Sequence, residues 1–211
     1  MLQRTSTYRI VKEEDENMLC PFCLSRIPEG TVCPCCGRKA SDYEGASHHF
    51  PANTKLNQKY LVGRALGEGG FGITYAGLDL TLQRKVAIKE YFPTSFVKRE
   101  STLTLEVTCY TGEKQTQYEK GKNEFLQEAR TLARLDNIQE IVRVLDYFPA
   151  NNTAYIVMEY LEGDTLSSIL KRDGRIPKAD LFPKLAPLLR ALDMVHHEGD
   201  IHRDISPDNI I

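Results

Sequence analysis

The sequence has no long apolar run and no cluster of basic charge. No stretch approaches the roughly 18 consecutive apolar residues of a membrane-spanning helix, and the first 20 residues lack the apolar core of a signal peptide. The net charge is −2, and no run of lysine and arginine is present to hold nucleic-acid phosphates. These absences predict a cytoplasmic location, no nucleic-acid partner and no membrane segment within the chain. They say nothing of any segment beyond Ile211.

Cysteine is scarce outside one short segment. Five of the six cysteines lie between Cys20 and Cys36, and because disulfides are rare in the cytosol this grouping indicates metal binding. Two C-x-x-C pairs, nine residues apart, offer four thiolates to a tetrahedral Zn²⁺, and the predicted ligands are Cys20, Cys23, Cys33 and Cys36. A redox pair or incidental cysteines are the alternative.

The cysteine segment resembles a short zinc ribbon, with a C-P-x-C-G knuckle at residues 33–37. So short a segment buries too little apolar surface to fold alone, so the metal would supply the folding energy. A site closed by four cysteines has no open position for a substrate. We therefore expect a structural zinc, a possible protein partner for the ribbon, and Cys35 pointing away from the ion.

Composition divides the chain into four parts. Residues 1–17 are polar and read as a flexible leader, 18–38 as the zinc ribbon, and 39–58 as a linker rich in turn residues. His48 and His49 are interpreted as solvated residues of that linker. Residues 59–211 show strand and helix periodicities that predict one α+β domain.

Residues 67–72 read G-E-G-G-F-G and follow an apolar strand that starts at Tyr60. These glycines alone would also suit a dinucleotide-binding turn, but such a turn opens a helix. Here β-branched and aromatic residues follow, which favour a second strand. The pattern predicts a glycine-rich hairpin whose backbone N–H groups can approach phosphate oxygens.

Lys89 ends the apolar strand V-A-I-K at residues 86–89, and residues 94–113 suggest an insertion with an extra strand. A helix is predicted over 123–135, with Glu128 on its apolar face beside Phe125. An unpaired carboxylate there would be costly, so we expect a buried cation to meet it, and Lys89 is the natural partner. Glu124, nearer the helix start, is the competing carboxylate.

The second half of the domain continues with a hairpin and two helices. Strands over 141–148 and 154–158 meet at Asn151-Asn152, helices follow over 164–171 and 178–197, and Gly199 is the expected C-cap. Residues 202–209 then read H-R-D-I-S-P-D-N. Asp204 is suited to accept a proton from an attacking hydroxyl, and Asn209 to ligate a metal.

In this order the motifs resemble a protein kinase of the bacterial eukaryotic-type serine/threonine kind, over residues 60–211. The resemblance implies an N-lobe over 59–162, a partial C-lobe over 163–211, and ATP, Mg²⁺ and a protein substrate. It assigns catalysis to Asp204, Lys89 and Glu128, and Mg²⁺ to Asn209. The nucleotide-binding positions it implies, with Met158 as gatekeeper, are Leu66, Gly67, Glu68, Gly69, Gly70, Phe71, Gly72, Thr74, Ala87, Lys89, Met158, Glu159 and Leu161.

Two departures from the family pattern bear on activity. Ser206 stands where serine/threonine kinases commonly have a lysine that neutralises the transferring phosphate. The D-F-G segment is absent before Ile211, so we expect a kinase fragment that is inactive by itself and whose 178–197 helix exposes apolar surface. The alternative function is a pseudokinase scaffold whose zinc ribbon docks a partner.

Overall fold

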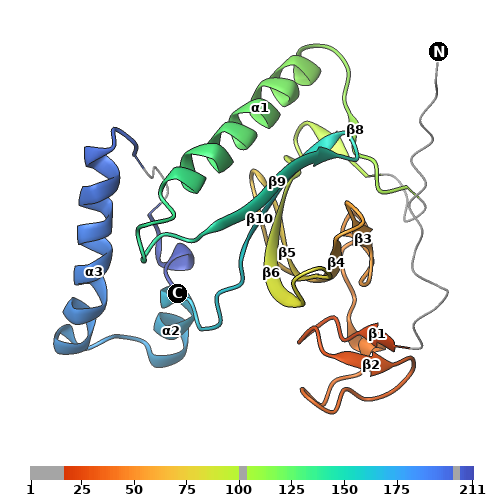
Figure 1. Ribbon diagram of the computed structural model, residues 1–211, viewed down its shortest axis with the longest axis horizontal. Helices are drawn as coiled ribbons and strands as arrows, with labels where there is room; N and C mark the ends of the chain where they lie inside the picture. The colour runs from red at the N-terminus through yellow and green to blue at the C-terminus, as the bar shows by residue number, and fades with distance from the viewer. Residues whose placement is uncertain (1–16, 100–103, 202–204) are drawn as a thin grey trace.

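The computed structural model describes residues 17–99, 104–201 and 205–211 (Figure 1). A six-stranded antiparallel sheet with strand order β3-β4-β5-β6-β10-β9 forms its centre, and two small antiparallel pairs, β1-β2 and β7-β8, lie outside it. The strands are β1 Asn17–Leu19, β2 Arg26–Pro28, β3 Lys55–Leu56, β4 Tyr60–Gly69, β5 Gly72–Asp79, β6 Arg84–Tyr91, β7 Val97–Lys98, β8 Thr108–Cys109, β9 Val144–Ala150 and β10 Thr153–Glu159.

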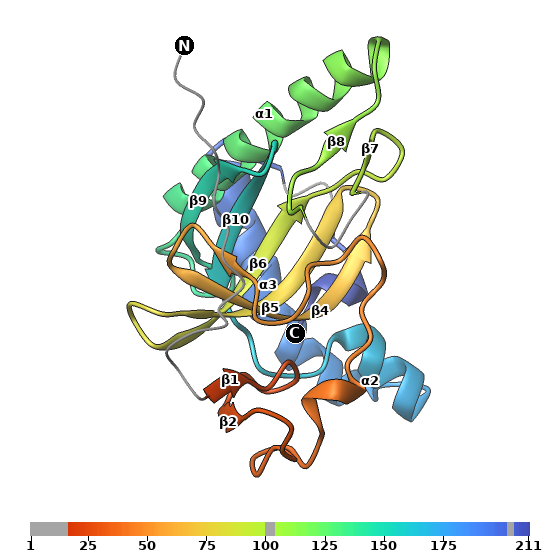
Figure 2. The ribbon, with the colours of Figure 1, turned by 90° about the vertical axis from the view of Figure 1, so that its right-hand side faces the viewer.

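Within the described residues, three α-helices accompany the sheet. Helix α1, Glu113–Arg134, packs against β9 and β10. Helices α2, Leu166–Asp173, and α3, Lys178–His197, lie to the left of β5 and β6 in Figure 1. Short 3-10 turns occur at Ala40–Asp42 (η1) and Pro207–Asn209 (η2). Figure 2 shows β1 and β2 below the large sheet, on the same side of the molecule as α2.

The hairpin predicted around Asn151 and Asn152 is confirmed. Both asparagines have positive φ angles, 53° and 61°, as a two-residue type I′ turn requires, and asparagine tolerates this region better than most residues. Thr165 caps α2 by accepting a hydrogen bond from Ser168 N. Helix α3 matches its predicted range, although two prolines lie inside it, and Gly199 follows its C-cap with a φ of 84°.

Helix α1 begins ten residues before the predicted start at residue 123. Its first half is polar and has no continuous apolar stripe, so the periodicity gives no signal there. Tyr118 nonetheless anchors this half, since it is buried and stacks on Tyr91 with ring centroids 5.3 Å apart. Gly121 is required at the crossing, because a Cβ there would overlap the Tyr91 hydroxyl.

The interpretation of His48 and His49 as solvated linker residues is wrong. Phe50 is 1% exposed and Leu56 is fully buried, and β3 adds an edge strand to β4 within the 39–58 segment. His48 and His49 expose only 28% and 12% of their side chains. The segment is mostly polar, but a few apolar side chains placed against the sheet are enough to order it.

The predicted insertion is a two-stranded ribbon, β7 paired with β8. The end of α1 and the loop after it pack on α3 through Leu135, Ile138, Ile141, Ala191 and Val195. Away from this contact, α3 exposes large apolar side chains, namely Phe182, Leu189 and Met194. Among the helices of the described ranges, none combines the length and apolar character needed to span a membrane.

Candidate active site

The glycine-rich segment forms the tip of the β4–β5 hairpin, where Gly69 pairs with Gly72. A Cβ built on Gly67, Gly69 or Gly70 would meet no atom within 4 Å, so these three positions face open space. A Cβ on Gly72 would overlap the carbonyl oxygen of Glu90 on β6. The first three glycines therefore leave the backbone accessible, whereas Gly72 is needed for packing.

Lys89 and Glu128 lie together, as the sequence led us to expect. Lys89 Nζ is 3.5 Å from Glu128 Oε1 and 5.5 Å from the centroid of the Phe125 ring. Glu124 instead lies 3.8 Å from Lys120 on the same helix. The arrangement joins the end of β6 to the middle of α1.

The expectation that Glu128 is buried is wrong. The side chains of Lys89 and Glu128 are 31% and 52% exposed. An ion pair this exposed contributes only about 0–1 kcal/mol to stability. The pair therefore contributes little to holding the fold.

Four of the expected nucleotide contacts share one face of the sheet. Lys89 is the register partner of Thr74, and Ala87 is the partner of Met158. Side chains alternate across a strand, so these four residues project to the same side, and all four are partly exposed. They line the sheet beside the glycine-rich hairpin.

The end of β10 and the segment after it provide polar backbone groups at the edge of this face. Glu159, the last residue of β10, makes two hydrogen bonds with Arg143: its N–H donates to Arg143 O at 3.0 Å, and its Oε1 accepts from Arg143 N–H at 2.9 Å. Leu161 is 44% exposed, and its N–H has no hydrogen-bond partner among the residues that the structure describes. A free N–H of this kind suits a heterocyclic acceptor such as adenine.

The predicted catalytic aspartate, Asp204, lies outside the described residues. Asn209 is described, in the 3-10 turn that follows Ser206. The backbone just after it is tied to the start of α2, where Leu166 N–H donates to Ile210 O at 2.7 Å.

The four cysteines of the two C-x-x-C pairs converge. Cys20 Sγ is 3.6 Å from Cys36 Sγ, and Cys23 Sγ is 3.5 Å from Cys33 Sγ. Zinc bonded to four sulfurs at about 2.3 Å separates them by roughly 3.8 Å, whereas a disulfide needs about 2 Å. The cluster therefore fits a tetrahedral zinc ion. Cys35 is exposed and outside it.

The cysteine cluster already favours a thiolate. Burial raises the pKa of Cys23, but hydrogen bonds from Ser25, Cys33 and Cys20 outweigh it and lower that pKa to about 6. The pKa of Cys36 is raised to about 12, although a hydrogen bond from the Arg38 backbone lowers it, because burial and its three neighbouring cysteines oppose ionisation. The lowered pKa of Cys23 favours a negative charge that a bound cation would neutralise.

The predicted zinc ribbon packs directly on the β4–β5 hairpin, a contact that sequence reasoning did not predict. Arg64 N–H donates to Pro21 O at 3.0 Å, and a Cβ on Gly63 would lie 2.6 Å from Leu24 Cδ2. Asn53 joins the ribbon to the 39–58 segment, since its side chain exchanges two hydrogen bonds with the backbone of Leu19. No local motif marks these contacts, because each joins residues more than thirty positions apart.

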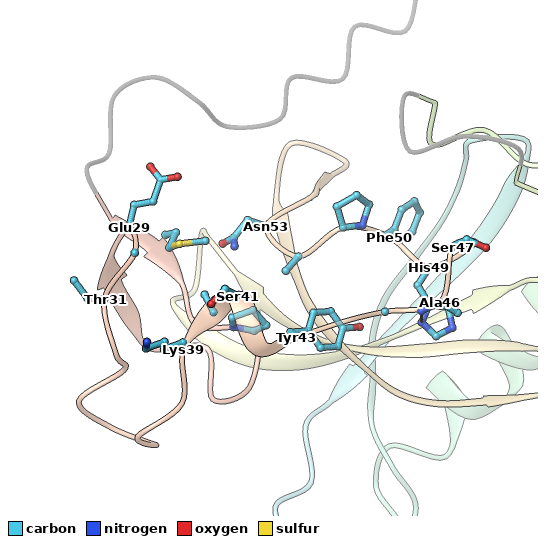
Figure 3. Close-up of a pocket in the computed structure, with 17 residues that line it drawn as sticks. Glu29, Thr31, Lys39, Ser41, Tyr43, Ala46, Ser47, His49, Phe50 and Asn53 are labelled. Carbon is cyan, nitrogen blue, oxygen red and sulfur yellow. Dashed lines mark hydrogen bonds between the residues drawn. The ribbon is translucent and has the colours of Figure 1, made fainter.

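A hollow of about 560 Å³ lies between the ribbon and the 39–58 segment (Figure 3). Thr31 and Lys39 border its ribbon end, and His49 and Phe50 border the other. It is separate from the sheet face that carries Lys89.

Sequence reasoning also missed a buried ion pair behind the site. Glu90 is fully buried beside Arg99 of the insertion. Glu90 follows Val86 and Ile88 at alternate, inward positions of β6, so the strand period could have flagged it as a buried charge in need of a partner. The partner itself has no local signal.

Comparisons with known proteins agree with this geometry. The protein kinase domain family matches residues 60–211. Serine/threonine-protein kinase B of Synechocystis sp. is 32% identical over 157 residues, which cover 74% of this chain and 25% of that protein. Serine/threonine-protein kinase PknL of Mycobacterium tuberculosis is 33% identical over 156 residues, covering 74% of this chain and 34% of that protein.

Two solved structures extend the comparison. The structure titled "PpkA-294 apo form" superposes with a TM-score of 0.71 and 37% identity, over 77% of this chain and 57% of that one. A structure of Rad53 superposes with a TM-score of 0.54 and 19% identity, over 72% of this chain and 34% of that one, and supports the fold alone. The chain belongs to the protein kinase domain family, which confirms the kinase-like α+β fold and the bacterial serine/threonine kinase resemblance.

Proposed function

We propose that this chain is the nucleotide-binding part of an ATP-dependent serine/threonine protein kinase. The observation that carries the proposal is the Lys89–Glu128 pair, 3.5 Å apart, next to a hairpin whose first three glycines face open space. Glu128 aims the Lys89 ammonium at the α- and β-phosphates, and the backbone N–H groups of residues 67–70 approach the phosphate oxygens. The Leu161 N–H would hold the adenine ring.

Phosphoryl transfer itself needs groups from the second lobe. Asp204 would accept the proton of a protein serine or threonine hydroxyl as that oxygen bonds to the γ-phosphorus and the bond to the leaving ADP oxygen breaks. Asn209 would hold Mg²⁺, which neutralises phosphate charge when bound. Ser206 offers no positive charge to the transferring phosphate, so we expect slower transfer than in kinases with a lysine at that position.

The cysteine cluster is proposed to hold a structural Zn²⁺. Support comes from the two Sγ–Sγ separations and from the contact of the ribbon with β4. Because Leu24 already packs on the kinase sheet, a protein partner of the ribbon would have to use its remaining surface. The division between ribbon and linker stays part of this proposal, whereas the leader predicted over residues 1–17 lies, except for Asn17, outside the described residues.

A non-catalytic scaffold is the second candidate, and Ser206 is the observation that favours it. The two candidates differ in transfer rather than in nucleotide binding. Asp204→Asn separates the two candidates, because this substitution abolishes phosphorylation by a kinase and leaves a scaffold's function unchanged.

Nucleotide binding tests the shared part of the proposal. We expect calorimetry to detect Mg²⁺–ATP binding to the chain, and Lys89→Met to weaken it by about tenfold or more, because a hydrogen bond to a charged group contributes about 1.5–3 kcal/mol. Glu128→Gln should weaken binding less, since the lysine remains.

Glu124→Gln is the matched control on α1, because Glu124 contacts Lys120 rather than Lys89. It should bind like the unmodified chain. Equal affinities of the Lys89→Met variant and the unmodified chain would contradict the proposed role of Lys89.

A further inference from the structure

Two histidines of the 39–58 segment converge on the glycine-rich loop. His48 Nε2 lies 3.0 Å from Glu68 Oε1, and His49 Nε2 lies 3.0 Å from Glu68 Oε2. Glu68 stands between two glycines of the hairpin tip, whereas the histidines come from a segment about twenty positions earlier. Three side chains that can ligate metals, from two separate segments, thus place their donor atoms within 4.8 Å of one another.

The two imidazole rings are held in place by their surroundings. His48 stacks on Phe92, with ring centroids 5.5 Å apart and an interplanar angle of 12°, and its carbonyl accepts a hydrogen bond from Arg99 Nη1. His49 meets the Tyr75 ring edge to face at 6.0 Å. Phe50, the next residue, is buried in the core. The histidines therefore need little ordering when a ligand arrives.

The donor set is that of a divalent transition metal. Imidazole nitrogen and carboxylate oxygen bind zinc at about 2.0–2.2 Å, so neighbouring donors around one ion lie roughly 3 Å apart, as each histidine does from its carboxylate oxygen here. The Glu68 side chain is 33% exposed, which leaves room for water at the remaining positions. Both carboxylate oxygens face a ring, so the glutamate can bind through one oxygen or both.

We propose that His48, His49 and Glu68 form a second metal site, for Zn²⁺ or a chemically similar divalent ion, that fastens the glycine-rich loop to the segment before the sheet. The site shares no residue with the four-cysteine cluster.

Metal binding replaces hydrogen bonds already present at this site. Ala46 N–H approaches His49 Nδ1 at 3.3 Å, so that ring carries its proton on Nε2 and donates it to Glu68. When Nε2 binds an ion, the proton moves to Nδ1 and the exposed Ala46 N–H turns to water. Burial opposes ionisation of Glu68, but the hydrogen bonds from His49 and His48 outweigh it and lower its pKa, so the carboxylate is ready as a ligand.

The consequence for the kinase site rests on the proposed nucleotide-binding function. Gly69 and Gly70 directly follow Glu68, and their open backbone is the part that would cover the phosphates. An ion that holds Glu68 restrains this hairpin tip. Metal binding should therefore change nucleotide affinity without touching Lys89.

Zinc stoichiometry tests the site independently of nucleotide binding. The full chain is first loaded until the cysteine site is saturated and then titrated with further Zn²⁺ in a calorimeter. We expect the unmodified chain to bind two zinc ions, one for each cluster. His49→Ala and Glu68→Gln should each bind only the cysteine-site ion, because a carboxamide is a weaker ligand than a carboxylate.

The double variant His196→Ala/His197→Ala is the matched control, since it removes two neighbouring exposed histidines from α3. It should retain both ions. Glu68 is exposed and Gln has the same shape, so Glu68→Gln stays informative even if His49→Ala disturbs packing. A single zinc ion in the unmodified chain, or a second ion retained in Glu68→Gln, would overturn the proposal.

Mg²⁺–ATP affinity measured with and without the second ion provides a second readout. A zinc-dependent change in the unmodified chain that is lost in Glu68→Gln supports the fastening role, and an unchanged affinity refutes that role. If the chain bound no nucleotide at all, the zinc titration would still decide whether the site exists.

Discussion

Replacing Arg99 by methionine tests whether one buried ion pair holds three parts of the fold together. Glu90 is fully buried and accepts hydrogen bonds from Arg99, from the Tyr155 hydroxyl at 2.9 Å and from the Tyr75 hydroxyl at 3.3 Å. The Arg99 guanidinium lies 4.2 Å from the centroid of the Phe50 ring. Arg99 thus connects the insertion, β6 and the 39–58 segment.

The expected loss of stability follows from this burial. Removing one partner of a buried ion pair costs about 3–5 kcal/mol, because the other charge is left without compensation. Methionine is long and apolar, so it can still pack on the rings of Phe50 and Phe92, whose centroids lie 4.2 and 5.0 Å from the Arg99 guanidinium carbon. We therefore expect the free energy of unfolding to fall by about 3 kcal/mol near neutral pH.

The loss should also depend on pH. Burial raises the pKa of Glu90 although the positive charge of Arg99 opposes this rise. Removing Arg99 should therefore raise the pKa of Glu90 further. A carboxyl group with a raised pKa in the folded state binds more protons folded than unfolded, and stability then falls as pH rises above the ordinary glutamate pKa. The Arg99→Met variant should lose more stability at about pH 8 than at about pH 5.

Urea denaturation at both pH values, followed by circular dichroism, measures these changes. Arg172→Met is the control, because Arg172 pairs with Asp164 and Asp173 at an exposed site, and it should change stability little at either pH. The double variant Glu90→Gln/Arg99→Met should recover part of the loss, since no charge remains buried. A loss below about 1 kcal/mol, or one that is equal at both pH values, would refute the reasoning.

Two further predictions concern the glycine-rich hairpin and the cysteine cluster. Gly72→Ala should lower the free energy of unfolding by about 1–3 kcal/mol, because its Cβ overlaps the backbone of β6. Gly69 has open space around it, so Gly69→Ala should leave stability nearly unchanged and weaken Mg²⁺–ATP binding. Thermal melts of both variants measure their stability, and equal melting temperatures would contradict the packing argument. Cys33→Ser should remove the zinc ion and the protection from proteolysis that the ion gives the ribbon, whereas Cys35→Ser should keep both. Zinc analysis and limited trypsin digestion measure these effects. Loss of zinc in Cys35→Ser would show that the ligand set is wrong.

Features that depend on neighbouring residues were predictable from the sequence. The I′ turn at Asn151 and Asn152 and the cap at Thr165 follow from the local preferences of those residues, and the structure contains them. The convergence of the two C-x-x-C pairs follows from their spacing. Predicting that Lys89 pairs with Glu128 required the order of the motifs as well as the helix period.

Features that depend on distant contacts were not predictable. The amphipathic pattern of α1 put Glu128 on an apolar face, but its exposure depends on what lies opposite that face. The composition of residues 39–58 suggested solvent, whereas Phe50 and Leu56 bury themselves against strands that follow in the chain. Whether a polar segment is ordered depends on the apolar surface available elsewhere.

The sequence by itself determined the family and the order of its motifs, and it predicted the residues of the two expected sites, because each motif is a short pattern of residue types with its own chemistry. Only the tertiary structure decided that Arg99 meets Glu90, that the ribbon packs on β4, and that His48 and His49 converge on Glu68. These contacts join segments from nine to more than thirty residues apart, and their partners are selected by the packing of the sheet rather than by any local preference.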